Sequence, residues 1–285
     1  MEEIVYNVFL EMLKEDLPFG DITTEKLIPE TTLARAVIKA KQDGVVACID
    51  DLAAVLEKMG IEVRRRLRDG EQFSKGDIIM ELVGSARKIL MLERTVLNLL
   101  MRCSGIATST RNMVVKARRV NPNVRIAATR KTSPLLRYFE KKAVLAGGGD
   151  THRFSLSDAV LIKKNHLRIL GDVSEAVRRV REKTSFAHKV EVEVSTIEEA
   201  LKAVEAGADI VMLDNVQPSE IRAVVEELKR RGLRERVLLE ASGGINLENV
   251  EEYAKTGVDV ISCGWITMSS PAIDMSLEIV EVLEK

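Results

Sequence analysis

The chain has 285 residues, a formal net charge of −1, and 46% hydrophobic but only 4% aromatic residues. This length allows one large domain or two of ordinary size. The near-zero charge argues against a broad surface for nucleic acid or anionic membranes. Few aromatic residues among many aliphatic ones favour an α/β core of Val, Ile, Leu and Ala.

The cysteines Cys48, Cys103 and Cys263 are widely spaced and form no C-x-x-C pair or Cys/His cluster. This pattern predicts free thiols in a reducing compartment and does not favour a structural zinc site. The start, M-E-E-I-V-Y-N-V-F-L-E-M-L-K, is acidic and amphipathic, unlike a signal peptide, and no apolar run approaches the roughly 20 residues needed to span a bilayer. We therefore expect a cytoplasmic protein with neither membrane nor nucleic acid as a partner.

The first third of the chain mixes helix and strand signals without a regular repeat. Gly44 interrupts an Ala- and Val-rich stretch and predicts two strands within 33–49. A long helical pattern runs over 87–119, where Gly105 is expected to split it, and N-P-N at 121–123 ends it because proline cannot continue a helix. The other elements predicted for this α+β part are helices at 4–14 and 52–59 and strands at 61–67 and 77–83.

From residue 124 onward, apolar strands alternate with amphipathic helices. This repeat predicts a parallel sheet covered by helices. The strands are predicted at 124–130, 159–163, 189–194, 209–214, 237–242 and 258–264. The helices are predicted at 134–146, 173–183, 197–206, 219–231, 247–255 and 272–283.

A closed barrel and an open doubly wound sheet would both give this repeat, and the positions of the polar residues decide between them. Each predicted strand ends in a polar or glycine residue, whereas an open sheet concentrates its ligand groups beside the switch point. We therefore predict a ring of strand ends with six strands in place of eight. The fold class is α/β, an atypical and incomplete (β/α) barrel preceded by an N-terminal α+β domain.

Fixed positive charges are concentrated between residues 129 and 163. Arginine binds planar carboxylates through two parallel hydrogen bonds, and lysine binds phosphate as a point charge. Such a cluster in a nearly neutral chain predicts a small, highly anionic ligand, although each residue alone could equally be a surface ion-pair partner. The candidates are Arg130, Lys131, Arg137, His152, Arg153 and Lys163.

Glu193 and Asp214 stand at the ends of two successive predicted strands. They could bind a Mg²⁺ ion that bridges phosphates, or hold sugar hydroxyls; alternatively, they cap helices or pair with lysines. Glu191, on the same strand as Glu193, is interpreted as structural. Glycine-rich loops after the last two strands could bring backbone N–H groups to a phosphate, or serve only as turns. These loops contain Ser242, Gly243, Gly244 and Gly264.

Short motifs distributed over nearly the whole chain point to one family. They are E-D-L-P-F-G-D-I-T near the start, E-R-T-x-L-N-L-L at 93–100, S-G-I-A-T at 104–108, T-R-K-T at 129–132, H-R at 152–153, L-I-K-x-N-H at 161–166, E-V-E-V at 191–194, M-L-D-N at 212–215 and S-G-G-I at 242–245. Together they make the chain resemble the quinolinate phosphoribosyltransferases. The resemblance implies a sandwich-like N-terminal α+β domain, an atypical (β/α) barrel and a homodimer; whether dimers assemble further stays open. We expect the first domain to cover 1–100, joined by a C-terminal helix at 271–285, and the catalytic barrel to cover 101–270.

The resemblance also implies roles for individual residues. Thr129 is expected in the substrate site, and the residues that would hold the two quinolinate carboxylates are Arg130, His152, Arg153 and Lys163. Arg94 would reach this site from the neighbouring subunit. The catalytic group that handles the pyrophosphate, Mg²⁺ and ribose of phosphoribosyl pyrophosphate would be Lys131, Lys163, Glu193 and Asp214, the last two as metal ligands. The 5′-phosphate would be bound by Ser242, Gly243, Gly244 and Gly264.

The implied reaction transfers phosphoribosyl to quinolinate with loss of pyrophosphate and CO₂, giving nicotinate mononucleotide in de novo NAD biosynthesis. One alternative is a related phosphoribosyltransferase acting on another acid, such as the homologue of molybdenum-transport operons. Another is a non-catalytic barrel that senses a phosphosugar, against which the Glu193/Asp214 pair argues because phosphate binding alone needs no metal ligands. Three positions depart from the family pattern: Met268 replaces a common histidine, Lys164 a common aspartate and Thr151 a common asparagine.

Overall fold

A computed structural model of the chain describes residues 2–283 and divides into two compact units. The first unit contains the residues up to 111, 134–148 and those from 270 onward. The second contains 112–133 and 149–269. Each unit therefore combines segments that are distant in the sequence.

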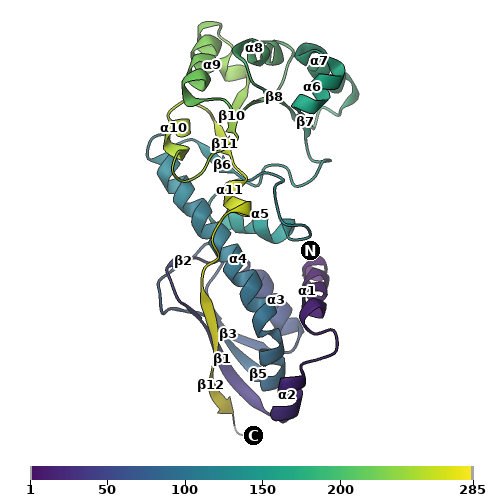
Figure 1. Ribbon diagram of the computed structural model, residues 1–285, viewed down its shortest axis with the longest axis vertical. Helices are drawn as coiled ribbons and strands as arrows, with labels where there is room; N and C mark the ends of the chain where they lie inside the picture. The colour runs from purple at the N-terminus through teal and green to yellow at the C-terminus, as the bar shows by residue number, and fades with distance from the viewer. Residues whose placement is uncertain (1, 284–285) are drawn as a thin grey trace. The chain divides into compact units, whose positions relative to one another are not determined.

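An antiparallel sheet forms the centre of the first unit, with the strand order β12–β1–β5–β3 (Figure 1). On β1, Ala34, Ala36 and Ile38 are fully buried, while Arg35 and Lys39 point the other way and bind glutamates of β12. This alternation is typical of a sheet with one face in the core. The strands are β1 (Leu33–Ala40), β3 (Glu62–Arg66), β5 (Ile78–Ser85) and β12 (Met275–Leu283), and a separate two-stranded sheet pairs β2 (Gly44–Val45) with β4 (Gln72–Phe73).

Five helices belong wholly or in part to this unit. The predictions at 4–14 and 52–59 are confirmed as helices, whereas α2 was not predicted, although the Asp21 side chain caps it by accepting from the N–H groups of Thr23 and Thr24. The helices are α1 (Glu2–Asp16), α2 (Ile22–Leu27), α3 (Ile49–Lys58), α4 (Ala86–Arg118) and α5 (Arg137–Ala146).

Gly105 does not split the long helix, so this prediction was wrong. α4 continues through it, and a Cβ atom at residue 105 would lie 2.1 Å from the backbone oxygen of Pro271. Glycine is therefore needed here for close backbone approach and not for a break.

The C-terminal helix predicted at 271–285 is also wrong. Residues Met275–Leu283 form β12, which pairs antiparallel with the whole of β1, from Leu33 opposite Leu283 to Ala40 opposite Met275. The helical spacing of apolar residues misled the prediction, because the strand partner lies more than 230 residues away and leaves no local signal. The last two residues of the predicted helix lie outside the described residues.

A parallel sheet of six strands, in the order β6–β11–β10–β9–β8–β7, forms the centre of the second unit. β6 and β7 are the two ends of this order, so the described sheet is an incomplete barrel, as predicted. Each strand lies within its predicted range. The strands are β6 (Arg125–Ala127), β7 (Val160–Ile162), β8 (Val190–Val194), β9 (Ile210–Asp214), β10 (Leu238–Ser242) and β11 (Val260–Ser262).

The helices of this unit follow the strands along the chain. The helix predicted after β6 exists as α5 but belongs to the first unit, and α6, α11 and the 3₁₀ turn η1 were not predicted. The helices are α6 (Lys164–Leu170), α7 (Val173–Lys183), α8 (Ile197–Glu205), α9 (Pro218–Arg230), η1 (Arg234–Arg236), α10 (Val250–Ala254) and α11 (Trp265–Met268).

Strand periodicity gives this sheet one apolar face and one face that carries the polar side chains, called the chemical face below. On β8, Val190, Val192 and Val194 are fully buried and share one face, while Glu191 and Glu193 share the other. The same alternation separates Leu239 and Ala241 from Glu240 and Ser242 on β10, and Val211 and Leu213 from Met212 and Asp214 on β9. Polar side chains therefore emerge together on one side of the sheet.

Candidate active site

A cavity of about 500 Å³ lies at the chemical face of the six-stranded sheet. Its lining residues all belong to the second unit and come from five of the six strands, β7 to β11, or from the segments that follow β6, β7 and β9. They are Ala128, Thr129, Arg130, Lys131, His152, Arg153, Leu161, Lys163, Glu193, Met212, Asp214, Asn215, Glu240, Ser242 and Ser262. Cations and carboxylates thus converge on one cavity of small-molecule size.

Most of the sequence-predicted site residues meet in this cavity. Those that line it are Thr129, Arg130, Lys131, His152, Arg153, Lys163, Glu193, Asp214 and Ser242. Gly243 and Gly244 directly follow Ser242, and Gly264 contacts the side chain of Lys131. Arg94 is exposed on α4 in the first unit, and Arg137 of the predicted cation cluster begins α5 in that unit. The substrate contacts of these residues stay predictions.

Two lysines neutralise the carboxylates at the ends of β8 and β9. The Lys163 ammonium lies 3.5 Å from Glu193 Oε1, and the Lys164 ammonium lies 2.9 Å from Asp214 Oδ2. Lys164, which departs from the family pattern, thus partners one of the two predicted metal ligands. Both pairs are partly exposed, so each carboxylate is held weakly enough to exchange partners.

The loop after β10 requires glycine at Gly243. Its φ is +99°, and a Cβ atom there would lie 2.4 Å from Asn215 Oδ1 and 2.8 Å from Asn215 N. Asn215 N–H in turn donates to the Ser242 carbonyl oxygen at 2.8 Å. The loops after β9 and β10 are therefore locked together by backbone contact beside Ser242.

Lys131 is positioned by the loop after β11. Its backbone oxygen accepts a hydrogen bond from Thr267 Oγ1 at 2.6 Å, and a Cβ atom at Gly264 would lie 2.7 Å from Lys131 Cδ. The lysine stem therefore lies across the glycine, and Lys131 lines the cavity.

His152 and Arg153 lie in the segment between α5 and β7. The N–H of His152 donates to Asp150 Oδ1 at 2.8 Å, and His152 has a left-handed φ of +51°. Arg153 is 9% exposed, and its Nη1 donates to the Ala159 carbonyl at 3.0 Å. Burial, together with the nearby Arg130 guanidinium, lowers the pKa of Arg153. Two guanidinium groups that line one cavity favour the binding of an anion there.

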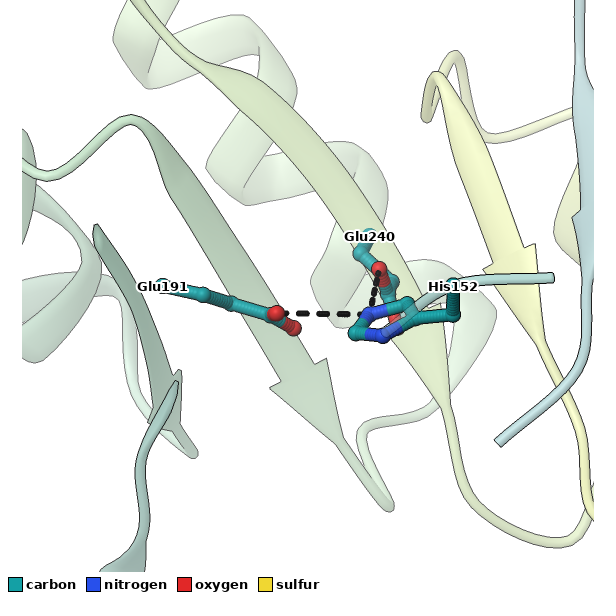
Figure 2. Close-up of side chains that lie close together, drawn as sticks. All are labelled: His152, Glu191 and Glu240. Atoms are coloured by element: carbon teal, nitrogen blue, oxygen red, sulfur yellow. Dashed lines mark ion pairs between the residues drawn. The ribbon is translucent and has the colours of Figure 1, made fainter. Parts of the chain in front are cut away.

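Two buried carboxylates surround the His152 ring (Figure 2). Its Nε2 lies 3.2 Å from Glu191 Oε2 and 3.3 Å from Glu240 Oε2, although neither contact reaches full hydrogen-bond geometry. Burial lowers the pKa of His152, whereas the two carboxylates raise it; the backbone N–H of Arg153, which donates to Nδ1, opposes the charged form as well. Burial also raises the pKa of Glu191, against the effect of His152.

Sequence reasoning missed this cluster. Glu191 was interpreted as structural and Glu240 was not considered, although each lies two residues before a predicted site residue on the same strand face. A glutamate inside an otherwise apolar strand was the available signal, since a buried charge needs a partner. The neutral lining residues Asn215 and Ser262 were missed as well.

Family models match almost the entire chain. "Quinolinate phosphoribosyl transferase, N-terminal domain" matches residues 21–104, and "Quinolinate phosphoribosyl transferase, C-terminal domain" matches residues 106–278. The chain belongs to this family. The resemblance seen in the sequence motifs is thereby confirmed, and with it a phosphoribosyltransferase fold and class of enzyme.

Curated relatives and solved structures agree with this assignment. A probable nicotinate-nucleotide pyrophosphorylase [carboxylating] of Methanothermobacter thermautotrophicus is 52% identical, covering 96% of this chain and 98% of the relative. The nicotinate-nucleotide pyrophosphorylase [carboxylating] of Homo sapiens is 38% identical over 94% of this chain and 89% of its own length. The crystal structure of NadC from Streptococcus pyogenes has a TM-score of 0.90 at 33% identity, covering 98% of this chain and 96% of that one.

The described residues also bear on membrane association. Between residues 2 and 283, none of the helices combines the length and the apolar character that crossing a bilayer requires.

Proposed function

We propose that this chain transfers phosphoribosyl from phosphoribosyl pyrophosphate to quinolinate, releasing pyrophosphate and CO₂ and forming nicotinate mononucleotide for de novo NAD biosynthesis. This is the activity named for the curated relatives. The observation that supports it best is a single cavity that joins the Arg130–Arg153 cation pair to the Glu193–Asp214 carboxylate pair. The alternatives weighed from the sequence find no support among the relatives.

The cation half of the cavity suits a pyridine dicarboxylate. Arg130 and Arg153 are the planar donors, and Lys163 adds a mobile point charge at the end of β7. Binding would place the ring nitrogen toward the carboxylate half. The same cations would screen the two substrate carboxylates from each other and from pyrophosphate.

The carboxylate half suits the ribose and pyrophosphate. Glu193 and Asp214 are hard oxygen donors at adjacent strand ends, a set that fits Mg²⁺, although Lys163 and Lys164 must yield part of their contacts to it. Bound there, Mg²⁺ would neutralise the leaving pyrophosphate. Lys131 would take further charge from this group, and the backbone N–H groups of Gly243 and Gly244 would hold the 5′-phosphate.

The bond changes follow from this arrangement. The pyridine nitrogen bonds to ribose C1 as the bond from C1 to the pyrophosphate oxygen breaks, and its electron pair leaves with pyrophosphate. The carboxylates stabilise the positive charge that develops on the ribose. The bond between ring C2 and its carboxyl carbon then breaks and CO₂ departs, while the electron pair of that bond stays on C2 beside the positively charged ring nitrogen and takes a proton.

We further propose a homodimer in which Arg94 of each subunit completes the site of the other, located in the cytoplasm. The exposed position of Arg94 on α4 supports such a reach. Burial of all three free cysteines is consistent with a reducing compartment.

One assay tests the activity. The purified protein is incubated with quinolinate, phosphoribosyl pyrophosphate and Mg²⁺, and nicotinate mononucleotide and CO₂ are measured. Arg130→Ala should chiefly raise KM for quinolinate, whereas Asp214→Asn should chiefly lower kcat and raise the Mg²⁺ requirement. Tight quinolinate binding without any product would contradict the proposed function, and turnover of another acid in preference to quinolinate would favour the related phosphoribosyltransferase.

A further inference from the structure

Both ring nitrogens of His152 are engaged by the protein itself. Nδ1 accepts a hydrogen bond from the backbone N–H of Arg153 at 2.8 Å, and Nε2 faces Glu191 and Glu240 (Figure 2). A nitrogen that accepts carries no proton, so the ring proton is on Nε2, between the two carboxylates. Each nitrogen thus faces a protein group.

The carboxylates are fixed on both sides of β9. Glu191 on β8 and Glu240 on β10 are each 1% exposed, and the hydroxyl of Ser262 donates to the second oxygen of Glu240. Glu191 Oε1 has no hydrogen-bond partner among the described residues. These two carboxylates therefore depend on the His152 ring for their main compensation.

The same three groups could in principle hold a metal ion, since their ligand atoms all lie within 4.8 Å of one another. A histidine bound to metal through Nε2 normally donates a proton from Nδ1 to a second partner. Here Nδ1 accepts instead, which leaves the proton on Nε2 and removes the lone pair that a metal needs. The geometry favours a cluster in which the Nε2 proton faces the two carboxylates at ion-pair distance, without a metal ion.

The charge of the cluster and its hydrogen bonds favour opposite protonation states of His152 Nδ1. The carboxylates favour a second proton on the ring, as the raised pKa of His152 indicates. That proton would have to sit on Nδ1, where it would face the Arg153 N–H across 2.8 Å. Two N–H groups at this distance repel, so the observed turn requires Nδ1 without a proton.

We propose that His152 is a positioning residue, held by Glu191 and Glu240 with its proton on Nε2 so that Nδ1 anchors the backbone of Arg153 and places its guanidinium in the cavity. This rests on the proposed function only for the identity of the acid that Arg153 binds. It departs from the role implied by the family resemblance, in which His152 itself holds a carboxylate. The left-handed φ of His152 and its N–H bond to Asp150 complete the anchor.

Two substitutions separate positioning from direct contact. In His152→Asn, the amide oxygen can occupy the place of Nδ1, keep the Arg153 bond and tolerate the left-handed φ. In His152→Gln, the longer amide reaches toward the place of Nε2 and loses that acceptor. We expect KM and Kd for quinolinate to rise about tenfold more in His152→Gln than in His152→Asn, as for the loss of one buried hydrogen bond.

The reverse order would show that the Nε2 end contacts the substrate and would overturn the proposal, as would equal losses in both variants. Glu191→Met should mimic His152→Gln, and Glu191→Gln, which keeps an acceptor oxygen, should recover most of the loss; no recovery contradicts the role of Glu191. Binding of phosphoribosyl pyrophosphate should stay within about twofold in all variants, which a general loss of folding would not allow. His188→Gln, outside the cavity, is the control.

A spectroscopic measurement gives an answer independent of turnover. The chain has three histidines, so ¹⁵N shifts of labelled imidazoles can be assigned with His152→Asn, His188→Gln and a His166 variant. Near neutral pH, His152 should show a protonated Nε2 and an unprotonated Nδ1. A proton on Nδ1 overturns the proposal even if the enzyme is active, whereas inactive protein with the expected tautomer contradicts only the proposed function.

Discussion

Gly243 and Gly244 offer a direct test of the predicted phosphate loop. Both have a positive φ, but only at Gly243 would an added Cβ atom overlap a neighbouring residue. The two φ angles are +99° and +63°, and an alanine at either costs about 1–2 kcal/mol for the left-handed backbone. A methyl group at 244 meets nothing within 4 Å, whereas one at 243 would overlap Asn215 at 2.4–2.8 Å. Since Asn215 N–H is bonded to Ser242, its backbone cannot retreat freely, and overpacking adds about 1–3 kcal/mol.

Thermal unfolding and steady-state kinetics measure the two consequences. Gly244→Ala should lower Tm by roughly 2–8 °C, and Gly243→Ala by clearly more. Gly243→Ala should also raise KM for phosphoribosyl pyrophosphate at least about tenfold, because moving Asn215 or Ser242 displaces the N–H groups offered to the 5′-phosphate. Gly232→Ala, with φ +68° and open space, is the matched control, with the Tm loss of Gly244→Ala and an unchanged KM. Equal Tm values for the 243 and 244 variants would refute the argument.

The remaining predictions concern the partner subunit, the metal and pH. At a quinolinate concentration far below the KM of the variants, Arg94→Ala and Arg130→Ala should each be nearly inactive. After subunit exchange their mixture should regain about one quarter of wild-type activity, because half of the dimers then carry one intact site; no recovery contradicts the reach of Arg94. Lys164→Gln should lower the Mg²⁺ concentration for half-maximal activity by up to about fivefold, since an exposed ion pair worth 0.2–1 kcal/mol no longer competes for Asp214; an unchanged requirement speaks against that competition. Burial raises the pKa of Cys263 from 9.0 to about 11. A thiol whose pKa is raised by folding makes the protein less stable as pH rises, so the Cys263 contribution to the free energy of unfolding should be unchanged below pH 8 and fall by about 2–3 kcal/mol by pH 11. Burial also raises the pKa of Cys48, Tyr138 and Tyr253. Urea unfolding should therefore show a loss in both proteins that is about 2–3 kcal/mol smaller in Cys263→Ala than in the wild type; a loss of equal size in both would disprove it.

The repeat of strands and helices after residue 124 was predictable because each element carries its own periodicity. Every strand of the six-stranded sheet lies within its predicted range, and α7 was predicted residue for residue. Strand ends with polar residues also indicated the ring, because all carboxyl ends of a parallel sheet lie on one side. These features are local in the sequence.

The wrong or missing predictions concern residues whose structure depends on neighbours distant in the sequence. β12 depends on pairing with β1, and Gly105 depends on the close backbone of Pro271; in both cases the deciding neighbour is distant in the chain. Glu240 was missed for the same reason, since no residue near it in the sequence indicates that His152 is its partner. The helix α5 was predicted correctly as a helix, but it belongs to the first unit and not to the barrel. Helical periodicity does not indicate against which sheet a helix packs.

The order β8–β9–β10 makes the two halves of the cavity depend on each other. Glu191 and Glu193 are two residues apart on β8 and share its chemical face, so one carboxylate anchors the His152 turn and the other stands with Lys163 at the metal end. A shift of β8 would therefore move the dicarboxylate half and the pyrophosphate half together. β10 makes a second link of the same kind, because Glu240 faces His152 and Ser242, two residues further on, precedes Gly243. The Ser262 hydroxyl joins these two residues, since it donates to Glu240 and lies 3.0 Å from the Ser242 hydroxyl. We therefore expect binding of the two substrates to be coupled through both strands.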